Sequence, residues 1–453
     1  WQVVYRGAIN DQLGYEVSRE KVKHHYLKDA IESLIGNKPI ALPRTEVQGC
    51  LINMKNFSKK VTYTDNVAPL LIKSCVPCHQ EGGVGPWHMD GYEKVKGWGT
   101  MIREVVRTKR MPPWYADSHY GKFKNDLSLS PEELSTIIQW IGQGFMRGQG
   151  DDPLKGRVST TDKNWLLGKP DLVFSMDEEQ QIPASGEEVF RNVLIEQSIP
   201  KDVWVRGLDL QPSNPKVVHH GNVVIRLPPE GLKAPEDESK GQGKEDWFMG
   251  SGMEAAGEGQ IITGYAPGSG PFELPEGTGF FIPKGAKLEF RMHYIPTGKP
   301  EKDLTRLGIY LHETKPAHAL SVEAILDRAL KIPSGEKEFK FQKSFVFDRP
   351  SILLALAPHM HYRGKSIKFT LIYPDGESEI VLSVPNYKFR WQRPYILEKP
   401  KSIPAGTTVL LEATYDNSSQ NPDNPDSLKE VVWGPKSSDE MFLGIIYYIT
   451  PVE

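Results

Sequence analysis

The distribution of turn residues constrains the fold more than any other feature of this sequence. The chain has 453 residues, and its 41 Gly and 36 Pro become dense after about residue 165. There they separate short alternating apolar runs and form turns such as Pro374-Asp375-Gly376. Such a pattern is typical of antiparallel β structure. We therefore predict a multidomain protein, in which a small α-helical domain precedes two antiparallel, jelly-roll-like β-sandwich domains.

One amphipathic helix is predicted near the N-terminus. Apolar residues recur at helical spacing between Val22 and Leu34, and Gly36 follows them. A single helix cannot form a domain. A strand is expected over Val3–Tyr5 before it. Together with Tyr5-Arg6-Gly7-Ala8-Ile9-Asn10-Asp11 and a final Gly49-Cys50, residues 1–56 resemble the C-terminal remnant of a thioredoxin- or peroxiredoxin-like domain. The half of that family that carries its redox cysteines is not in this sequence, so no redox role is predicted.

A second helical segment precedes the β region. Ser130 with Pro131 and Glu133 forms a capping box that has proline at the first helical position. An apolar stripe at helical spacing follows, formed by Leu134, Ile137, Ile138 and Ile141. We predict a small helical domain at 57–150, followed by a polar linker at 151–164.

The strand candidates after the linker are too numerous for one ordinary sandwich. A break near residue 320 would divide them into two sandwiches, at 165–320 and 321–453. Charge is nearly balanced, with 55 Lys and Arg against 58 Asp and Glu, so no basic surface suggests nucleic acid as a partner. No apolar run approaches the roughly 18 residues of a membrane span, and none is expected.

Cys75-Val76-Pro77-Cys78-His79 predicts one covalently attached haem c. Two thiols separated by two residues can each add to a haem vinyl group, while the adjacent imidazole binds the iron. A thioredoxin-type redox pair and half of a zinc site are the alternatives. The first lacks its βαβ setting and the second lacks two further ligands of suitable spacing. Three cysteines are also too few for a disulfide framework.

The opposite axial ligand of the haem is predicted to be Met111, within Arg110-Met111-Pro112-Pro113-Trp114. Two prolines would fix the loop that presents it. Met89 and Met101 are competing candidates, and core packing is the alternative role of Met111. The segment resembles class I cytochrome c domains with a Met-Pro-Pro loop. Ligation by His79 and Met111 would make an electron carrier, since both axial positions would be filled.

Six candidate metal ligands occur in a definite order along the β region: His219, His220, His293, His359, His361 and Met441. Apolar residues alternate along the strand 288–294, so His293 should project from the face opposite to them. His359 and His361 are two residues apart and would project from one strand face together. Unrelated surface and core histidines remain the alternative.

The neighbours His219 and His220 would point to opposite faces of a regular strand. To bind one ion together they require a bulge or a strand-end twist, which Gly221 could permit. Imidazoles alone suit zinc or copper, but a thioether beside two imidazoles favours copper, because sulfur stabilises Cu(I). Met441 is the candidate thioether. The sequence therefore favours copper as the bound metal.

This order of ligands resembles the copper type II ascorbate-dependent monooxygenases, the family of peptidylglycine α-hydroxylating monooxygenase and dopamine β-monooxygenase. The resemblance covers about residues 165–453 and includes Gly264-Tyr265, Thr414-Tyr415-Asp416-Asn417 and Asp439-Glu440-Met441. It implies two β-sandwich domains, each holding one copper ion across a solvent cleft.

By that resemblance the two sets of ligands have different roles. His219, His220 and His293 would hold the electron-storing copper, and His359, His361 and Met441 the catalytic copper that binds oxygen. The peptide-hydroxylating members place an arginine where this chain has Ala357, and a tyrosine where it has Ile445. Peptidyl-glycine is therefore not the expected substrate, and the small molecule or peptide that is hydroxylated stays unidentified.

The sequence thus predicts a copper-dependent monooxygenase that hydroxylates a C–H bond of its substrate with O2. Electrons would come through or beside the haem, from a redox partner protein, or from an external reductant such as ascorbate. The alternatives are an electron-transfer or copper-handling protein, and a binding module of an assembly. Because haem of this kind is attached outside the cytoplasm, we expect a protein exported to the periplasm or exterior of a bacterium.

Overall fold

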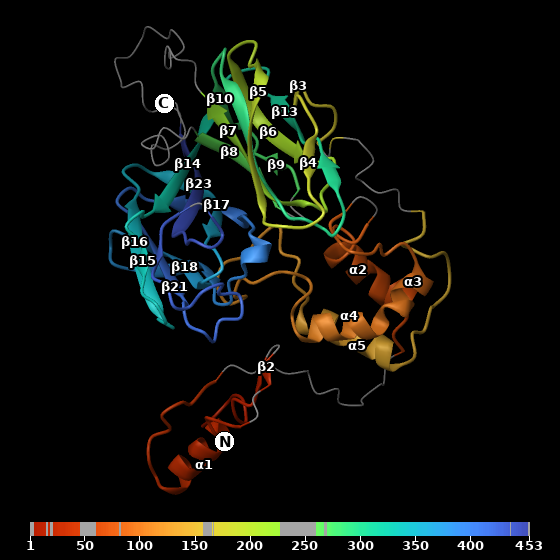
Figure 1. The fold of residues 1–453 in the computed structure, drawn as a ribbon, viewed down its shortest axis with the longest axis vertical. Coiled ribbons are helices and arrows are strands. Elements are labelled where there is room, and N and C mark those ends of the chain that lie inside the picture. The colour runs from red at the N-terminus through yellow and green to blue at the C-terminus, as the bar shows by residue number, and fades with distance from the viewer. Residues whose placement is uncertain are drawn as a thin grey trace. The chain divides into compact units, whose positions relative to one another are not determined.

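The computed structural model describes residues 4–14, 17–18, 21–45, 60–80, 83–156, 165, 167–226, 260–266, 270–434 and 436–451. These residues fold into two compact units (Figure 1). The helical unit comprises Trp1–Pro77, Met89–Trp114 and Leu127–Arg157, and the β unit comprises Cys78–His88, Tyr115–Asp126 and Val158–Glu453. Two segments from within the predicted helical domain therefore fold with the β strands.

The helical unit contains short helices and one small hairpin. Its elements are β1 (Leu13–Gly14), β2 (Val17–Ser18), α1 (Tyr26–Ile35), the π-helical turn η1 (Tyr63–Val67), α2 (Ala68–Ser74), α3 (Tyr92–Gly97), α4 (Gly99–Arg107) and α5 (Pro131–Gly142). The predicted capping box is confirmed at α5, because Ser130 Oγ accepts the Glu133 N–H and Glu133 accepts the Ser130 N–H. The predicted apolar stripe of α5 is buried.

Helix α1 begins four residues later than the spacing predicts. The backbone N–H groups of Lys23 and His24 donate to the carboxylate of Asp11, each at 2.9 Å, and so are held in a turn that precedes the helix. The expected strand over Val3–Tyr5 is absent at its two described residues, where no strand is formed. Gly49 and Cys50 lie outside the described residues, and the thioredoxin-like origin of this segment stays a prediction.

In the described part of the chain, the first sandwich of the β unit contains eleven strands. They are β3 (Leu172–Ser175), β4 (Gln180–Ile182), β5 (Val189–Ser198), β6 (Val203–Gln211), β7 (Val218–Arg226), β8 (Gln260–Tyr265), β9 (Phe272–Glu273), β10 (Thr278–Ile282), β11 (Lys287–Tyr294), β12 (Glu301–Asp303) and β13 (Arg306–Leu311). The order β5-β11-β7-β8 forms one layer, and β10-β6-β13-β3 belongs to a larger sheet. One continuous apolar core includes residues of both layers, such as Phe290 of β11 and Val205 of β6.

The second sandwich repeats this two-layer plan. Its elements are β14 (His318–Leu326), β15 (Lys331–Ile332), β16 (Phe339–Val346), β17 (Ser351–His359), β18 (Gly364–Ile372), β19 (Ser378–Val384), the 3-10 turn η3 (Phe389–Trp391), β20 (Tyr395–Ile403), β21 (Thr408–Tyr415), β22 (Val431–Val432) and β23 (Leu443–Pro451). The layers have the orders β16-β21-β18-β19 and β20-β17-β23-β14. They pack closely, since a Cβ at Gly444 would meet Leu411 at 2.7 Å and Phe369 at 2.8 Å.

One sheet runs through both sandwiches, because β10 pairs in parallel with β14. The predicted break near residue 320 falls within β14. A mostly β protein with stacked antiparallel sheets is therefore confirmed for this part of the chain. A cytochrome c fold for residues 57–150 stays a prediction.

Residues 115–126 lie along the edge strand β20. Phe123 forms an antiparallel bridge with Leu397, and the Lys124 N–H donates to the carbonyl oxygen of Ile396 at 2.8 Å. The Glu398 N–H donates in return to the Lys122 carbonyl at 2.8 Å. This segment therefore continues the sheet by one short strand-like pairing, which satisfies backbone groups that a sheet edge leaves open.

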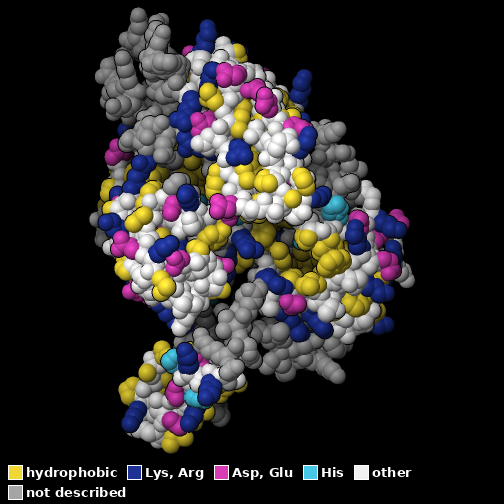
Figure 2. All heavy atoms as spheres, in the orientation of Figure 1, with side chains coloured by type: hydrophobic (Ala, Val, Ile, Leu, Met, Phe, Trp, Pro, Cys, Tyr) yellow, Lys and Arg dark blue, Asp and Glu magenta, His cyan; other side chains and the backbone are white. Residues whose placement is uncertain are grey.

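The surface carries charges of both signs. Figure 2 shows Lys and Arg side chains interspersed with Asp and Glu over the visible face. This agrees with the nearly balanced composition. Within the described residues, no helix combines the length and apolar character needed to cross a membrane.

Candidate metal centre

The first set of histidines lies where β7 and β11 pair. His220 is opposite His293, whereas Tyr294 is opposite Val218, so His219 is the extra residue of a β-bulge. The distortion that the sequence requires for two neighbouring imidazoles is thus present. Gly221 leaves room for the neighbouring side chain, since a Cβ at that position would come within 2.7 Å of the Met292 sulfur.

Three imidazole nitrogens converge at this bulge. The Nδ1 atom of His219 lies 3.1 Å from Nδ1 of His220 and 3.2 Å from Nδ1 of His293. Two nitrogens bound to one ion at about 2.0 Å, at a tetrahedral angle, are about 3.3 Å apart. The three side chains therefore fit a single metal ion bound through Nδ1.

His293 lies outside the apolar core, although only 1 % of it is exposed. The alternate residues Leu288, Phe290, Met292 and Tyr294 belong to the apolar core, as the strand pattern predicts. On the opposite face, the His293 ring stacks on Phe190 with centroids 4.2 Å apart. Its Nε2–H donates to the carboxylate of Glu188 at 3.1 Å. This bond leaves Nδ1 free to face the other two histidines.

The second set begins at the end of β17. His359 is the last residue of that strand and His361 follows it, with ring centroids 5.1 Å apart. The Nδ1–H of His359 donates to Oε1 of Gln392 at 2.6 Å, and that of His361 faces the Asp439 carbonyl at 3.4 Å. Both acceptors are oxygens, so the protons sit on Nδ1 and the Nε2 atoms are left for a ligand.

A buried carboxylate joins His361 to Met441. One oxygen of Glu440, a residue that is fully buried, accepts the backbone N–H of His361 and, at 2.9 Å, that of Met441. Its other oxygen accepts the N–H of Arg363 at 2.9 Å. Glu440 thus fixes the backbones that carry two of the three candidate ligands. Burial raises the pKa of Glu440 to about 7, against the lowering effect of these N–H donors.

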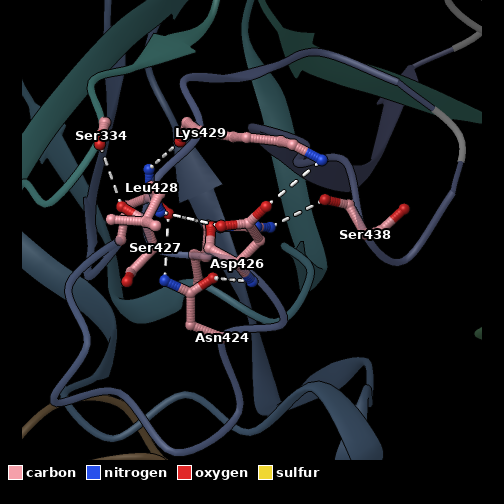
Figure 3. Close-up of polar contacts among 9 residues, drawn as sticks. Ser334, Asn424, Asp426, Ser427, Leu428, Lys429 and Ser438 are labelled. Atoms are coloured by element: carbon pink, nitrogen blue, oxygen red, sulfur yellow. Dashed lines mark hydrogen bonds and ion pairs between the residues drawn. The ribbon is translucent and has the colours of Figure 1, made fainter.

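Arg363 also supports the chain segment that precedes Met441. Its guanidinium is buried and donates to Oδ1 of Asn417 and to the carbonyl of Ser438, both at 2.8 Å. The guanidinium also faces the Asp426 carbonyl at 3.5 Å, and the Asp426 side chain pairs with Lys429 and accepts the Leu428 N–H (Figure 3). Met360, between the two histidines in the sequence, is fully buried.

Four histidines of the two sets have lowered pKa values, because burial disfavours the charged imidazole. The pKa falls to about 4 for His219, to about 4 for His359 and to about 3 for His361, and it lies well below the usual value for His220. These side chains are therefore neutral at pH 7, which is the form that binds metal.

The two sets lie close together, unlike the solvent cleft that the family resemblance implies. The rings of His220 and His359 have centroids 6.4 Å apart. Phe389 of η3 fills the space between the sets, with centroids 5.1 Å from His219 and 5.7 Å from His361. The side chains of Phe389 and Glu188 thus lie in the region where the resemblance implies a cleft.

The residues of the predicted haem motif are assigned to their units as follows. Cys75 caps α2 in the helical unit, and Cys78 and His79 belong to the β unit. The Nδ1–H of His79 donates to the Trp87 carbonyl at 3.0 Å. Its Nε2 is left for a ligand, so the motif fits an iron-binding imidazole whose tautomer is fixed by a second hydrogen bond.

The methionine candidates for the haem differ in exposure. Met111 follows α4 and is half-buried, Met89 is buried and Met101 is 44 % exposed. Met111 lies in the helical unit and its ligation stays a prediction.

Comparison with known proteins identifies the C-terminal part of the chain. Residues 318–453 match the family model described as copper type II ascorbate-dependent monooxygenase, C-terminal domain. This part resembles a copper monooxygenase domain. The matched range contains His359, His361 and Met441, and it supports a copper-dependent oxidoreductase.

Solved structures add no functional argument. The major capsid protein P2 from Bacteriophage PM2 aligns with a TM-score of 0.26 and 9 % identity, over 62 % of this chain and 98 % of that one. The STIV MCP aligns with a TM-score of 0.27 and 9 % identity, over 62 % and 97 % of the two chains. Both scores are too low to assign even the fold.

Three functional side chains at these sites gave no signal in the sequence. Glu188 and Gln392 lie far along the chain from the histidines that they orient. Glu440 stands beside Met441 within a run that resembles the family, but its bonds to two other backbones depend on the fold. Hydrogen bonds between distant segments leave no local periodicity that could have revealed them.

Proposed function

We propose that this protein is a copper-dependent monooxygenase that hydroxylates a C–H bond of its substrate with O2. The convergence of the Nδ1 atoms of His219, His220 and His293 carries the proposal, because it occurs in the unit that also contains the matched monooxygenase domain. Bound copper would supply an open coordination position for oxygen and the electrons that reduce it.

The chain's own residues would divide this work between two sites. His219, His220 and His293 would hold the electron-storing copper through Nδ1. His359 and His361 would hold the other copper through Nε2, with Met441 as the soft third ligand. Gln392 and Glu440 would keep the ligands of this second site in place.

The surroundings of the second site favour a substrate without a carboxylate. Ala357 and Ile445, which replace the arginine and tyrosine of the peptide-hydroxylating members, are directly paired partners of β17 and β23. Together they form a half-buried apolar pair that offers neither charge nor a hydroxyl group. A neutral, apolar small molecule or segment fits this pair better than a peptidyl carboxylate does.

We expect the protein to lie in the periplasm or outside the cell, and the haem to supply electrons to the copper sites. Cys78 belongs to the same compact unit as both histidine sets, and its thiol interacts electrostatically with Arg393. Arg393 directly follows Gln392, the hydrogen-bond partner of His359. A haem c attached at Cys78 would therefore lie close to the second site. Ascorbate or a redox partner protein would supply electrons to this haem. Absorbance of the pyridine haemochrome, lost in Cys78→Ala, would test attachment.

The decisive experiment measures whether an oxygen atom from O2 is incorporated into the product. The purified protein, loaded with copper, is given candidate apolar substrates, a reductant and oxygen-18, and products are analysed by mass spectrometry. The wild type should yield product carrying one labelled oxygen atom. Met441→Ala should abolish it with little loss of haem, whereas Met101→Ala, at an exposed methionine, should not. Retained hydroxylation in Met441→Ala would overturn the site assignment.

An electron-transfer or copper-handling protein is the second candidate. The observation that favours it is the 6.4 Å separation of the His220 and His359 rings, with Phe389 between the sets. Such packing suits electron exchange between metals and gives oxygen and substrate less room. Copper binding and reduction without any labelled product would support this function over hydroxylation.

A further inference from the structure

Glu188 contacts one histidine of the first set and two residues near the ligands of the second set. It directly precedes β5 in the first sandwich, and its side chain is 24 % exposed. One oxygen accepts the His293 Nε2–H at 3.1 Å and the Ser437 hydroxyl at 2.7 Å. The other oxygen accepts the Tyr362 hydroxyl at 2.7 Å.

These donors come from both sandwiches. His293 lies on β11, whereas Tyr362 directly follows His361 and Ser437 lies four residues before Met441. A single carboxylate thus joins one ligand of the first site to the two chain segments that carry ligands of the second site. Three side-chain donors fill much of its accepting capacity, so its position is well determined.

We propose that Glu188 is a positioning residue that fixes His293 as an Nδ1 ligand and joins the two candidate copper sites across the sandwiches. This inference rests on the proposed function, because it assumes that the histidines bind copper. A carboxylate that accepts the distal N–H of a ligating imidazole holds the ring in one orientation and makes the ligand more basic.

The charge on Glu188 has a consequence for the metal. A more basic imidazole stabilises the higher positive charge of Cu(II) relative to Cu(I). The carboxylate should therefore lower the reduction potential of the first site. Tyr362 and Ser437 keep the carboxylate in place, and their removal should weaken the same effect without abolishing it.

Glu188→Gln tests the proposal, because glutamine keeps the size of the side chain and removes its charge. Copper content per chain, Cu(II) affinity by competition with a chelator, the EPR spectrum and the reduction potential are measured on the full chain. We expect a 10- to 100-fold loss of affinity at one of two coppers, a changed spectrum and a higher potential. Glu187→Gln, at the exposed neighbouring position, is the matched control and should leave all four unchanged.

The outcomes separate this inference from the proposed function. A wild type that binds no copper would overturn both. A wild type that binds two coppers, with Glu188→Gln indistinguishable from Glu187→Gln, would overturn only the role of Glu188. If Glu188→Gln does not fold, judged by circular dichroism, the double variant Tyr362→Phe/Ser437→Ala replaces it. That variant should lose less than 10-fold in affinity, with the same direction of change in potential, and no change would contradict the proposal.

Discussion

The two histidine sets use the same kind of side chain but present opposite nitrogens. At the first site a β-bulge between two central strands aligns three Nδ1 atoms. At the second site Nδ1 of His359 and of His361 is engaged by Gln392 and by the Asp439 carbonyl, so Nε2 faces outward. The tautomer, and with it the ligand atom, is decided by the hydrogen-bond partner of each ring.

The sites also differ in what holds them. Strand register fixes the first site, and register in turn depends on the buried apolar face of β11. The second site lies where a strand ends, and the buried carboxylate of Glu440 holds its two chain segments together. A site supported by register should resist single substitutions better than one supported by a single buried side chain.

The largest expected effect is that of Glu440→Ala. The change removes the acceptor of three backbone N–H groups, those of His361, Arg363 and Met441. Each buried N–H left without a partner costs about 1 to 3 kcal/mol of the free energy of unfolding. Urea unfolding should report this loss, and copper analysis should show one copper retained. The control Glu430→Ala, at an exposed glutamate, should show neither effect. Loss of both coppers in Glu440→Ala would show that the two sites are not supported separately.

Copper removal should have the next largest effect. A metal ion that binds only the folded state stabilises it by about 2.7 kcal/mol when its free concentration is 100 times its Kd. A chelator should therefore lower the melting temperature of the β strands, followed by circular dichroism, and added copper should restore it. A variant lacking the first site, His219→Ala, should retain only part of this shift. An identical shift in that variant would mean that the first site holds no stabilising metal.

Gln392→Leu should affect only the second site. Without the amide acceptor, His359 loses the bond that fixes its tautomer, and losses of this kind reduce metal affinity by about 10- to 100-fold. Chelator competition measures the affinity of each copper. The exposed neighbour Lys388→Ala is the control and should bind copper as the wild type does. A weakened first site would show that the sites are not separately supported.

The smallest effect concerns acid stability without metal. The pKa of His219 is lowered to about 4 and that of His361 to about 3, because both imidazoles are buried. Between these values and about 6.5 the unfolded chain binds protons that the folded chain does not, so stability falls as pH decreases through this window. Urea midpoints of the metal-free protein at pH 7 and pH 5 measure the fall. Unchanged midpoints would contradict neutral, buried imidazoles at both sites.

The sequence determined much of this description because its signals are local. Alternation of apolar residues predicted the face from which His293 projects, and the adjacent His219 and His220 required the bulge that the register shows. The capping box at Ser130 was likewise correct, since its residues are three apart and interact with their own backbone.

Only the tertiary structure decided how the two sets relate. Glu188, Gln392 and Phe389 act on histidines that are distant in sequence, and the family resemblance had implied a solvent cleft where they lie. The pairing of β10 with β14 similarly joins two predicted sandwiches into one continuous sheet. Periodicity reports which face of an element is buried, but the partner of that face is chosen by packing across the whole chain.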